Sequence, residues 1–549
     1  MQTSSRFLTL ILAIAIVAFS SCGKSNKQGR YIPENAAIAV VVNGESLSNK
    51  LPWSEIKQTE WFKLLYNDST LDAFVKSALD NPDNTGIDTK KDLIFFAVKD
   101  SVGGYIAFEG TIKDEAAFKK FVTQVYENGK TESKDGMNYL SKNDITASWK
   151  DGMFVVAGNA PMLNQDNLMK ELGNADQSAP VNTSRDMVVA CQNVYALKED
   201  KSLAKDDKMS DLMKSKGDMH FWMNTEALYS GSLSNAALSM MNISKLYKGS
   251  FTTGVVNFDN GQINMDFKSY SGKEMTELTK KYSGSSLNKD MIGKMPSKNV
   301  VFFLSINFKP EGVREFLKLA GLDGFANMGS AFLGFNVDDF VKANKGDIAL
   351  SISDIRTDSM GRPDASFLFT ASIGDQAAFD KLIAAGKKIG KEEMGGQLDS
   401  KIFYSSNKNY FAIGNQQTDV NGFVGSAKNA EMPFMNKIGN SPIGMYIDIQ
   451  QMIKGVGASE MNRDSLSTIA YQATLNMWQD VLMSGGKLKD GAVEQHVEIN
   501  LVDKNTNSLK LLNKYINVLV DIENKKKAKY AAMFDESTFG DEPVVVAEP

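Results

Sequence analysis

Two short stretches, far apart in the chain, share one pattern of apolar and polar residues. "IKDEAAFKKFV" occupies residues 112–122, and "IGDQAAFDKLI" occupies residues 373–383. Apolar residues recur in both at intervals of three and four, which predicts amphipathic helices that each bury one face. The residues of this stripe are Phe118, Phe121, Val122 and Val125 in the first stretch, and Phe379, Leu382 and Ile383 in the second. Asp114 and Asp375 stand just before the helices, where aspartate is a favourable N-cap.

Strands are predicted around each helix. "YIAFEGTI" and "SFLFTASI" precede the helices, and their apolar or alternating residues are typical of strands. After the first helix, residues 145–159 predict two short strands joined at Asp151-Gly152, a dipeptide that favours a hairpin turn. Further hairpins are predicted at Asn260-Gly261 and at Asp490-Gly491. The sequence therefore indicates an α+β fold with mostly antiparallel sheets flanked by helices.

The same order of segments occurs twice along the chain. The matched pairs are residues 32–43 with 295–307, 86–100 with 334–354, 104–122 with 365–383, 145–159 with 401–415, 217–228 with 443–453, and 255–270 with 485–501. A repeat this long predicts a duplicated domain rather than a solenoid, whose units are about 20–50 residues. We therefore expect two tandem, internally duplicated α+β domains. The number of residues that separates a segment from its match in the second copy is smaller for the segments after Asn159 than for those before it. The first copy therefore contains an insertion after Asn159.

These patterns give a predicted organisation of the whole chain. We expect a signal peptide at residues 1–21, a tether at 22–30, a first repeat at 31–271 with a helical insertion at about 160–216, a linker at 272–293, a second repeat at 294–525 and a disordered tail at 526–549. The linker is polar and rich in Gly and Ser in its middle. The tail passes from a basic run into an acidic, Pro-containing segment without periodicity.

The N-terminal segment predicts export rather than a membrane span. Arg6 is followed by an apolar run from Phe7 to Phe19, which is too short to cross a bilayer and is typical of a secretory signal. Small residues then lead to Cys22 in "FSSC", which resembles the lipobox of bacterial lipoproteins. In such a site the cysteine thiol carries the lipid and becomes the first residue of the mature chain. We therefore expect a membrane anchor at Cys22, with a plain signal peptide as the alternative.

Composition and charge narrow the classes of function. Of the 549 residues, 42% are hydrophobic and 23% are charged, which is usual for a folded protein. The formal net charge is −5, so no basic surplus favours nucleic acid as a partner. With Cys22 lipidated, Cys191 has no cysteine left to pair with, and the fold must be held by its core without disulfides. The sequence leaves the role of Cys191 open.

Residues for the common catalytic and metal-binding arrangements are scarce. His220 and His496 are the two histidines of the chain, too few for a common zinc site without several carboxylates. No G-x-S-x-G elbow supports a Ser-His-Asp triad, and neither phosphate-binding glycine pattern occurs. We therefore expect no catalytic residue, no cofactor and no metal ligand.

Residues 81–92 match a calcium loop in part. The matching positions are Asn81, Asp83, Thr85, Gly86 and Asp92. The first position is not Asp, and the last is Asp where a bidentate Glu is expected. We predict instead that a helix stops at Gly86 and the chain turns into the next strand.

Several of these segments together resemble a known family. The lipobox, "YIPENAAIAVVVN", "TGID…KDLIFFAV" and "DEAAFKKFV" are similar to lipoproteins of the Bacteroidetes that are catalogued as domain of unknown function 4836. The resemblance covers nearly all of the mature chain, and its motifs are structural, so it implies no catalytic residues. It implies a lipid-anchored envelope protein. In that phylum an acidic run after the lipidated cysteine favours the cell surface; "GKSNKQGR" has no acid, which favours the periplasmic side of the outer membrane.

Three functions stay open from the sequence. The leading hypothesis is a non-catalytic envelope module that binds a ligand or a protein partner, because two like domains form a cleft between them. One alternative is a carboxylate-dependent hydrolase of glycans, which a pocket holding two carboxyl groups of perturbed pKa would favour. The other is a structural envelope spacer, for which we expect no pocket. Polar residues present in only one copy of a shared cleft would point to a site.

Overall fold

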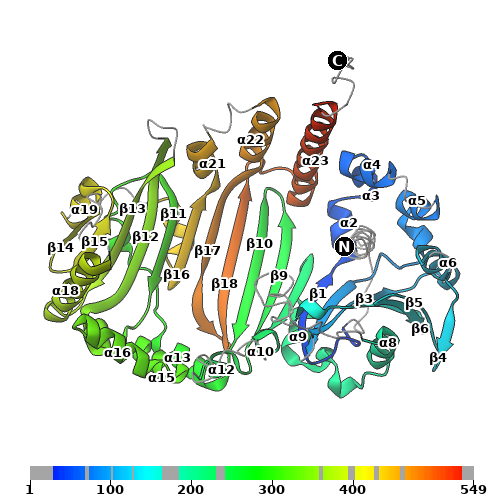
Figure 1. The fold of residues 1–549 in the computed structure, drawn as a ribbon, viewed down its shortest axis with the longest axis horizontal. Helices are drawn as coiled ribbons and strands as arrows, with labels where there is room; N and C mark the ends of the chain where they lie inside the picture. Colours follow the sequence, from blue (N-terminus) through cyan, green and yellow to red (C-terminus); the bar gives the residue numbers. More distant parts are fainter. Residues whose placement is uncertain are drawn as a thin grey trace, which may run out of the picture.

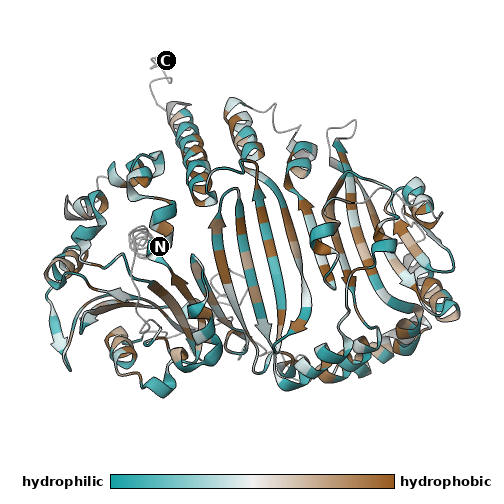
Figure 2. Cartoon of the chain, turned by 180° about the vertical axis from the view of Figure 1, so that it is seen from behind, coloured by the Kyte–Doolittle hydropathy of each residue, from teal (hydrophilic) through white to brown (hydrophobic). Residues whose placement is uncertain are grey.

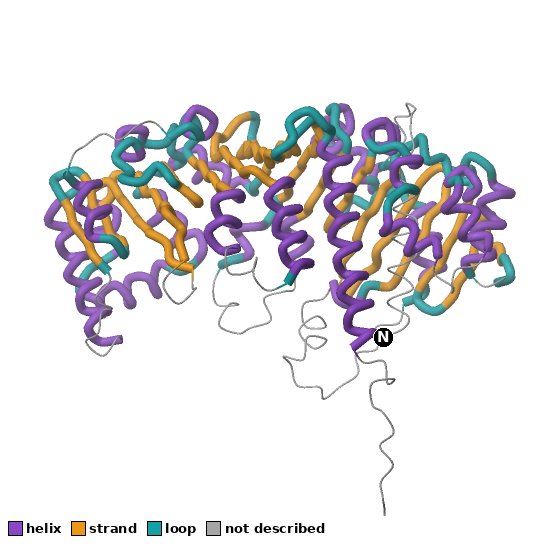
Figure 3. Tube along the Cα trace, turned by 90° about the horizontal axis from the view of Figure 1, so that it is seen from above, coloured by secondary structure: helices purple, strands orange, loops and turns teal. Residues whose placement is uncertain are grey.

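The computed structural model describes residues 29–67, 73–100, 103–126, 129–163, 185–229, 242–357, 363–393, 402–425, 432–457 and 464–533. A single curved antiparallel sheet runs through the molecule, with helices on both of its faces (Figures 1 and 3). The predicted signal peptide and the lipidation site Cys22 lie outside the described residues. Within the described ranges, no helix has the length and apolar character needed to cross a bilayer.

The strands fall into two sets along the chain. The first set is β1 (Ala36–Val42), β2 (Leu93–Asp100), β3 (Gly103–Thr111), β4 (Glu132–Lys134), β5 (Met137–Lys142), β6 (Ile145–Lys150), β7 (Met153–Asn159), β8 (Met219–Asn224), β9 (Phe251–Asp259) and β10 (Gln262–Tyr270). The second set is β11 (Val300–Asn307), β12 (Asn344–Thr357), β13 (Pro363–Ile373), β14 (Phe403–Ser406), β15 (Tyr410–Gly414), β16 (Ile443–Asp448), β17 (Trp478–Lys489) and β18 (Ala492–Leu501). We call these sets, with the helices between their strands, the first and second halves.

Eight strands of each half have the same order, and the halves meet at β10 and β18; β4 and β5 of the first half have no counterpart among the described strands of the second. From one end of the sheet to the other, the pairings run β4, β5, β6, β7, β3, β2, β1, β8, β9, β10, β18, β17, β16, β11, β12, β13, β15, β14. Both halves also carry a β-bulge at the same point, between Ala36 and Ile38 in β1 and between Val300 and Phe302 in β11.

The register of the β10–β18 ladder reads the same from either half. Its symmetric pairs include Gln262–Asn500, Asp266–His496 and Tyr270–Ala492. Gln262 and Ala492 are the first residues of their strands, and each follows the turn of a hairpin. The pair Asp266–His496 is therefore the midpoint about which strand order and register are symmetric.

The fold class is confirmed as α+β with antiparallel strands. The strands β10 and β18 join the two halves into one sheet. Pairing these strands removes two sheet edges whose free N–H and C=O groups would otherwise face solvent. That the halves arose by duplication, with the limits expected above, stays a prediction.

Helices connect the strands and cover the sheet. In the first half they are α2 (Gly44–Lys50), α3 (Trp53–Ile56), α4 (Glu60–Asn67), α5 (Ala73–Asp80), α6 (Glu115–Val125), α8 (Met187–Tyr195), α9 (Asp207–Lys214), α10 (Thr225–Tyr229) and α12 (Ser244–Tyr247). Between the halves lie α13 (Lys273–Tyr282) and α14 (Lys289–Ile292). In the second half they are α15 (Glu311–Ala320), α16 (Asp323–Leu333), α17 (Val337–Ala343), α18 (Gln376–Glu393), α19 (Gln417–Val424), α20 (Met435–Ile438), α21 (Ile449–Gly457), α22 (Ser465–Met477) and α23 (Ser508–Met533).

Apolar cores lie on both faces of the sheet. In the first half, Phe96 and Val155 pack under α8 on one face, and Phe108 and Phe154 pack under α6 on the other. Figure 2 shows the matching alternation, with hydrophobic and hydrophilic bands along the central strands. Successive side chains of a strand point to opposite faces, so a strand between two helical layers must be apolar on both.

The described helices test several predictions about single segments. Asp114 caps α6 by accepting a hydrogen bond from the Ala117 N–H at 3.0 Å, and Asp375 accepts one from Ala378 N–H at 2.8 Å, as predicted. The predicted linker at 272–293 contains α13 and α14. Helix α23 continues to Met533, past residue 526, where the sequence predicts the start of a disordered tail. Its last turns are built from Lys and Ala, which are strong helix formers even without an apolar stripe.

Candidate functional site

An apolar cavity of about 560 Å³ lies in the second half, between the sheet and the helices α17 and α18. Its walls come from β12 to β15 on the sheet side and from one face of each helix on the other. The lining residues are Phe308, Phe340, Ala343, Asn344, Ile348, Phe369, Ala371, Ser372, Ile373, Phe379, Leu382, Ile383, Gly386, Lys387, Ile402, Tyr404, Phe411 and Ile413. Its volume lies in the range of small-molecule sites, about 300–1,000 Å³.

The few polar groups of the cavity wall already have partners. The Ser372 hydroxyl donates to Asp347 Oδ2 at 3.1 Å. The side-chain amide of Asn344 donates to the Phe340 carbonyl at 3.0 Å. Both side chains bond within the protein, and most of the other lining side chains are aliphatic or aromatic, so the interior of the cavity presents a mainly apolar surface to a guest.

One end of the cavity reaches the protein surface. Tyr404 lines it and is 50% exposed, and Gly386 and Lys387 of α18 are exposed beside it. The Lys387 ammonium lies 5.5 Å from the centre of the Tyr404 ring, within the range of a cation–π contact. The cavity therefore has an apolar body and a cationic, partly aromatic mouth.

The corresponding region of the first half is filled by side chains. Trp149 of β6 is buried there and packs edge-on against Phe118, with 5.8 Å between ring centres. Phe118 also stacks on Phe154 at 5.2 Å, and Phe154 contacts Phe108 at the same distance. These rings close the space between α6 and the sheet.

The strand pairing and the helix spacing show which residues of the second half are equivalent to Trp149 and Val125. Trp149 lies opposite Phe154, and the equivalent residue opposite Phe411 is Ser406. On the helix, Val125 follows Phe118 at the same interval at which Gly386 follows Phe379. A Trp and a Val of the first half are thus a Ser and a Gly in the second, and of these two Gly386 lines the cavity.

Two polar cavities lie near the middle of the sheet. They measure about 540 and 610 Å³, and charged and amide side chains line both. The larger one contains the cross-strand pair Asp448–Asp480, which bears on the hydrolase alternative. Asp448 accepts hydrogen bonds from the backbone N–H of Gln451 at 2.8 Å and from its side-chain amide at 2.9 Å, and Asp480 accepts one from Asn500 at 2.7 Å. These carboxylates hold the start of α21 and the β17–β18 ladder, so they have structural roles.

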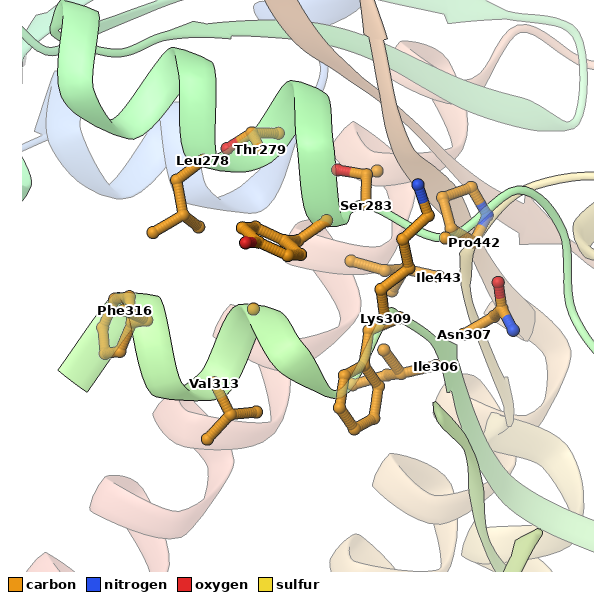
Figure 4. A pocket seen from close by; sticks show the side chains of 15 residues that line it. Leu278, Thr279, Ser283, Ile306, Asn307, Lys309, Val313, Phe316, Pro442 and Ile443 are labelled. Atoms are coloured by element: carbon orange, nitrogen blue, oxygen red, sulfur yellow. The ribbon is translucent and has the colours of Figure 1, made fainter. Parts of the chain in front are cut away.

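A smaller cavity of about 300 Å³ separates α13 from α15 (Figure 4). Leu278 of α13 faces α15, which carries Val313 and Phe316. Helix α13 follows the last strand of the first half, yet it packs on the second half. The space is a gap in the contact between α13 and the second half.

The structure gives Cys191, His220 and Gly86 local roles. Cys191 is fully buried in α8, and burial raises the pKa of its thiol to about 11, so it is a core residue. His220 is buried with Nε2 at 3.0 Å from the Ser215 carbonyl, and burial lowers its pKa. Gly86 ends a 3₁₀ turn, Pro82–Thr85, with φ +74°, which is the predicted stop. In the described part of the chain no cluster of three or more acidic, His or Cys residues could hold a metal ion.

Sequence reasoning missed Glu109, a carboxyl group buried in β3. It is 1% exposed, and its Oε2 has no hydrogen-bond partner in the described part of the chain. Burial raises the pKa of Glu109 to about 8. In the second half the equivalent residue is Thr370, because both pair with matching positions of the neighbouring strands. Glu109 lines none of the four cavities described above.

Comparison with known proteins places the chain in a family. Residues 30–416 match the family described as "Domain of unknown function (DUF4836)". The chain belongs to this family. The match begins before β1 and ends after β15, so it spans the first half and the strands that form the apolar cavity.

Other comparisons add little. No curated protein matches the chain. Among solved structures, crystal form IV of TP0453 is similar at 8% identity over 44% of this chain and 78% of that chain, with a TM-score of 0.26. Crystal form I of TP0453 gives 9% identity over 46% and 81%, also with a TM-score of 0.26. At these TM-scores the likeness supports no conclusion about function.

Proposed function

We propose that this protein is a non-catalytic, lipid-anchored protein of the cell envelope that binds an apolar small molecule in the cavity beneath α18. The observation that carries the proposal is the contrast between the packed rings around Trp149 in the first half and the open cavity at the equivalent place in the second. The same sheet and helix pack closed in one half and leave about 560 Å³ open in the other. The alternative of a purely structural spacer offers no reason for such a difference.

Energetics support a guest for this space. Protein interiors are close-packed, with few voids larger than a water molecule. Removing large side chains from a core costs about 2–5 kcal/mol when the space stays empty. The aromatic residues Phe369, Phe379 and Phe411 line the cavity. An apolar ligand would restore the contacts that Trp149 supplies in the first half.

Mass spectrometry of the intact soluble chain tests the binding. Residues 23–549, purified gently from the native host, are expected to carry an apolar molecule that is released on denaturation. Gly386→Trp is expected to remove it, because Gly386 lines the cavity and an indole there would occupy the space. Ser133→Trp, at an exposed position of β4, is the matched control and should keep the ligand. A wild-type chain that carries no bound molecule would contradict the proposal, and so would a ligand that stays bound in Gly386→Trp.

The anchoring part of the proposal rests on Cys22 and the apolar run before it. We propose that the lipid on Cys22 holds the protein at the outer membrane, facing the periplasm, because the residues after it lack an acidic run. Metabolic labelling with a radioactive fatty acid should mark the wild type and not Cys22→Ser. Protease added to intact cells should leave the protein uncut. Labelling of Cys22→Ser, or cleavage in intact cells, would contradict this part.

A further inference from the structure

We infer that the ligand of the cavity beneath α18 is a single-chain amphiphile whose anionic head group binds at Lys387. This inference rests on the proposed function and deepens it by naming the class of ligand. It follows from three features of the cavity: a dry interior, a single charge at its mouth, and a volume suited to one chain.

The interior accepts only an apolar chain. Of the two polar side chains in its wall away from the mouth, Ser372 bonds Asp347 and Asn344 donates to the Phe340 carbonyl, and the other side chains there are aliphatic or aromatic. A polar group of the ligand placed beside them would lose its water without gaining a partner, at a cost of about 1–3 kcal/mol. The buried part of the ligand is therefore hydrocarbon.

The mouth selects the charge of the head group. Lys387 is the one charged side chain among the described residues that line the cavity. It is exposed and stands over the Tyr404 ring at 5.5 Å, so its ammonium lies at the rim. An ammonium offers three donors and a positive charge to a carboxylate or phosphate at the end of the chain. A cationic head group would be repelled at the same place.

The volume suits one chain. About 560 Å³ lies within the range that holds a single drug-sized ligand. Gly386 forms part of the same rim, and a Cβ built on it would meet no atom within 4 Å. This open side of α18 lets a chain pass from the mouth into the interior.

Binding measurements with matched ligands test the inference. Hexadecanoic acid and hexadecanol share a chain and differ in the charge of the head group. The wild type should bind the acid about two- to fivefold more tightly than the alcohol, the gain expected of an exposed ion pair. Lys387→Met should remove this difference by weakening the acid alone. Lys408→Met, an exposed lysine outside the cavity lining, should preserve it.

A cavity-filling variant separates the two proposals. Gly386→Val adds a side chain into open space and should weaken the acid and the alcohol together, without loss of thermal stability. Equal binding of acid and alcohol to the wild type, with loss of both in Gly386→Val, would overturn the anionic head group and leave the proposed function standing. If neither ligand binds the wild type, both proposals fail.

Discussion

The imidazole of His496 lies against the carboxylate of Asp266, with 2.7 Å between Nδ1 and Oδ1. The two residues come from different halves and face each other at the midpoint of the β10–β18 ladder. The side chain of His496 is 39% exposed and that of Asp266 is 62% exposed. Exposed pairs of this kind contribute about 0–1 kcal/mol, so the contact marks the symmetric point of the sheet without holding the halves together.

The halves should instead be held by apolar residues of the same ladder. Ile263 of β10 is 7% exposed and lies opposite Ile499 of β18. We expect Ile263→Ala to lower the free energy of unfolding by about 2–4 kcal/mol, because it removes buried methyl groups at the junction. Asp266→Asn should change it by less than about 1 kcal/mol. Urea unfolding of both variants measures the contrast, and a larger effect of Asp266→Asn would show that the ion pair dominates.

The buried carboxyl of Glu109 should make stability depend on pH. Burial raises its pKa in the folded protein to about 8, from an ordinary value of 4.5. Between these values the unfolded chain has lost its proton and the folded protein keeps it. The free energy of unfolding therefore falls as pH rises through this window, by roughly 1.4 kcal/mol per unit, and the fall stops above the folded pKa.

Glu109→Gln removes this titration and keeps the shape of the protonated side chain. We expect the variant to gain stability relative to the wild type as pH rises from about 4.5 to 8, measured by urea unfolding at each pH. Glu311→Gln, at an exposed position of α15, is the control and should show no such trend. A difference between wild type and Glu109→Gln that stays constant with pH would mean that the carboxyl is ionised in the folded protein.

Local elements of this fold can be predicted from the sequence because their signals are local. The apolar stripe of Phe118, Phe121 and Val122 is buried as expected, and Asp114 caps its helix. The turn at Asp151-Gly152 has φ of 51° and 75°, the left-handed conformation that the dipeptide favours. Each of these features is decided by residues a few positions apart.

The pairing of β10 with β18 could not be predicted in the same way. Met265 lies opposite Val497, and the alternation of apolar and polar residues along β10 would be the same beside solvent as beside another strand. The apolar cavity could not be predicted from the sequence for a related reason. Ser406 alone is an ordinary residue of a strand. It becomes informative once the strand pairing shows that it is the equivalent of Trp149 in the first half.

The C-terminal helix of the second half should stabilise the first half. The indole N–H of Trp61 in α4 donates to Asn513 Oδ1 of α23 at 3.0 Å, and Asn513 is 9% exposed. Asn513→Ala leaves the indole donor without this partner, so we expect a cost of about 1–2 kcal/mol and faster amide hydrogen exchange in both α4 and α23. Lys525→Ala, at an exposed position of α23, is the control. Unchanged exchange in α4 would show that the two helices are energetically independent.

Two glycines with nearly equal backbone angles should differ in what an added methyl group costs. Gly86 and Gly152 have φ of +74° and +75°. A Cβ on Gly86 would lie 2.2 Å from the Asp114 carbonyl oxygen and 2.4 Å from the Phe118 nitrogen, whereas one on Gly152 would meet nothing within 4 Å. The crowding arises because the Gly86 carbonyl accepts hydrogen bonds from Lys113 and Asp114 N–H at 2.8 and 3.0 Å, which draws the start of α6 against it.

Both alanine variants carry the strain of a positive φ, about 1–3 kcal/mol, so their difference isolates the crowding. We expect Gly86→Ala to lower the free energy of unfolding by about 1–3 kcal/mol more than Gly152→Ala, as is typical of overpacking. Urea unfolding at constant pH measures the difference. Equal costs would mean that the start of α6 can move away from Gly86, and that the glycine is needed there only for its backbone conformation.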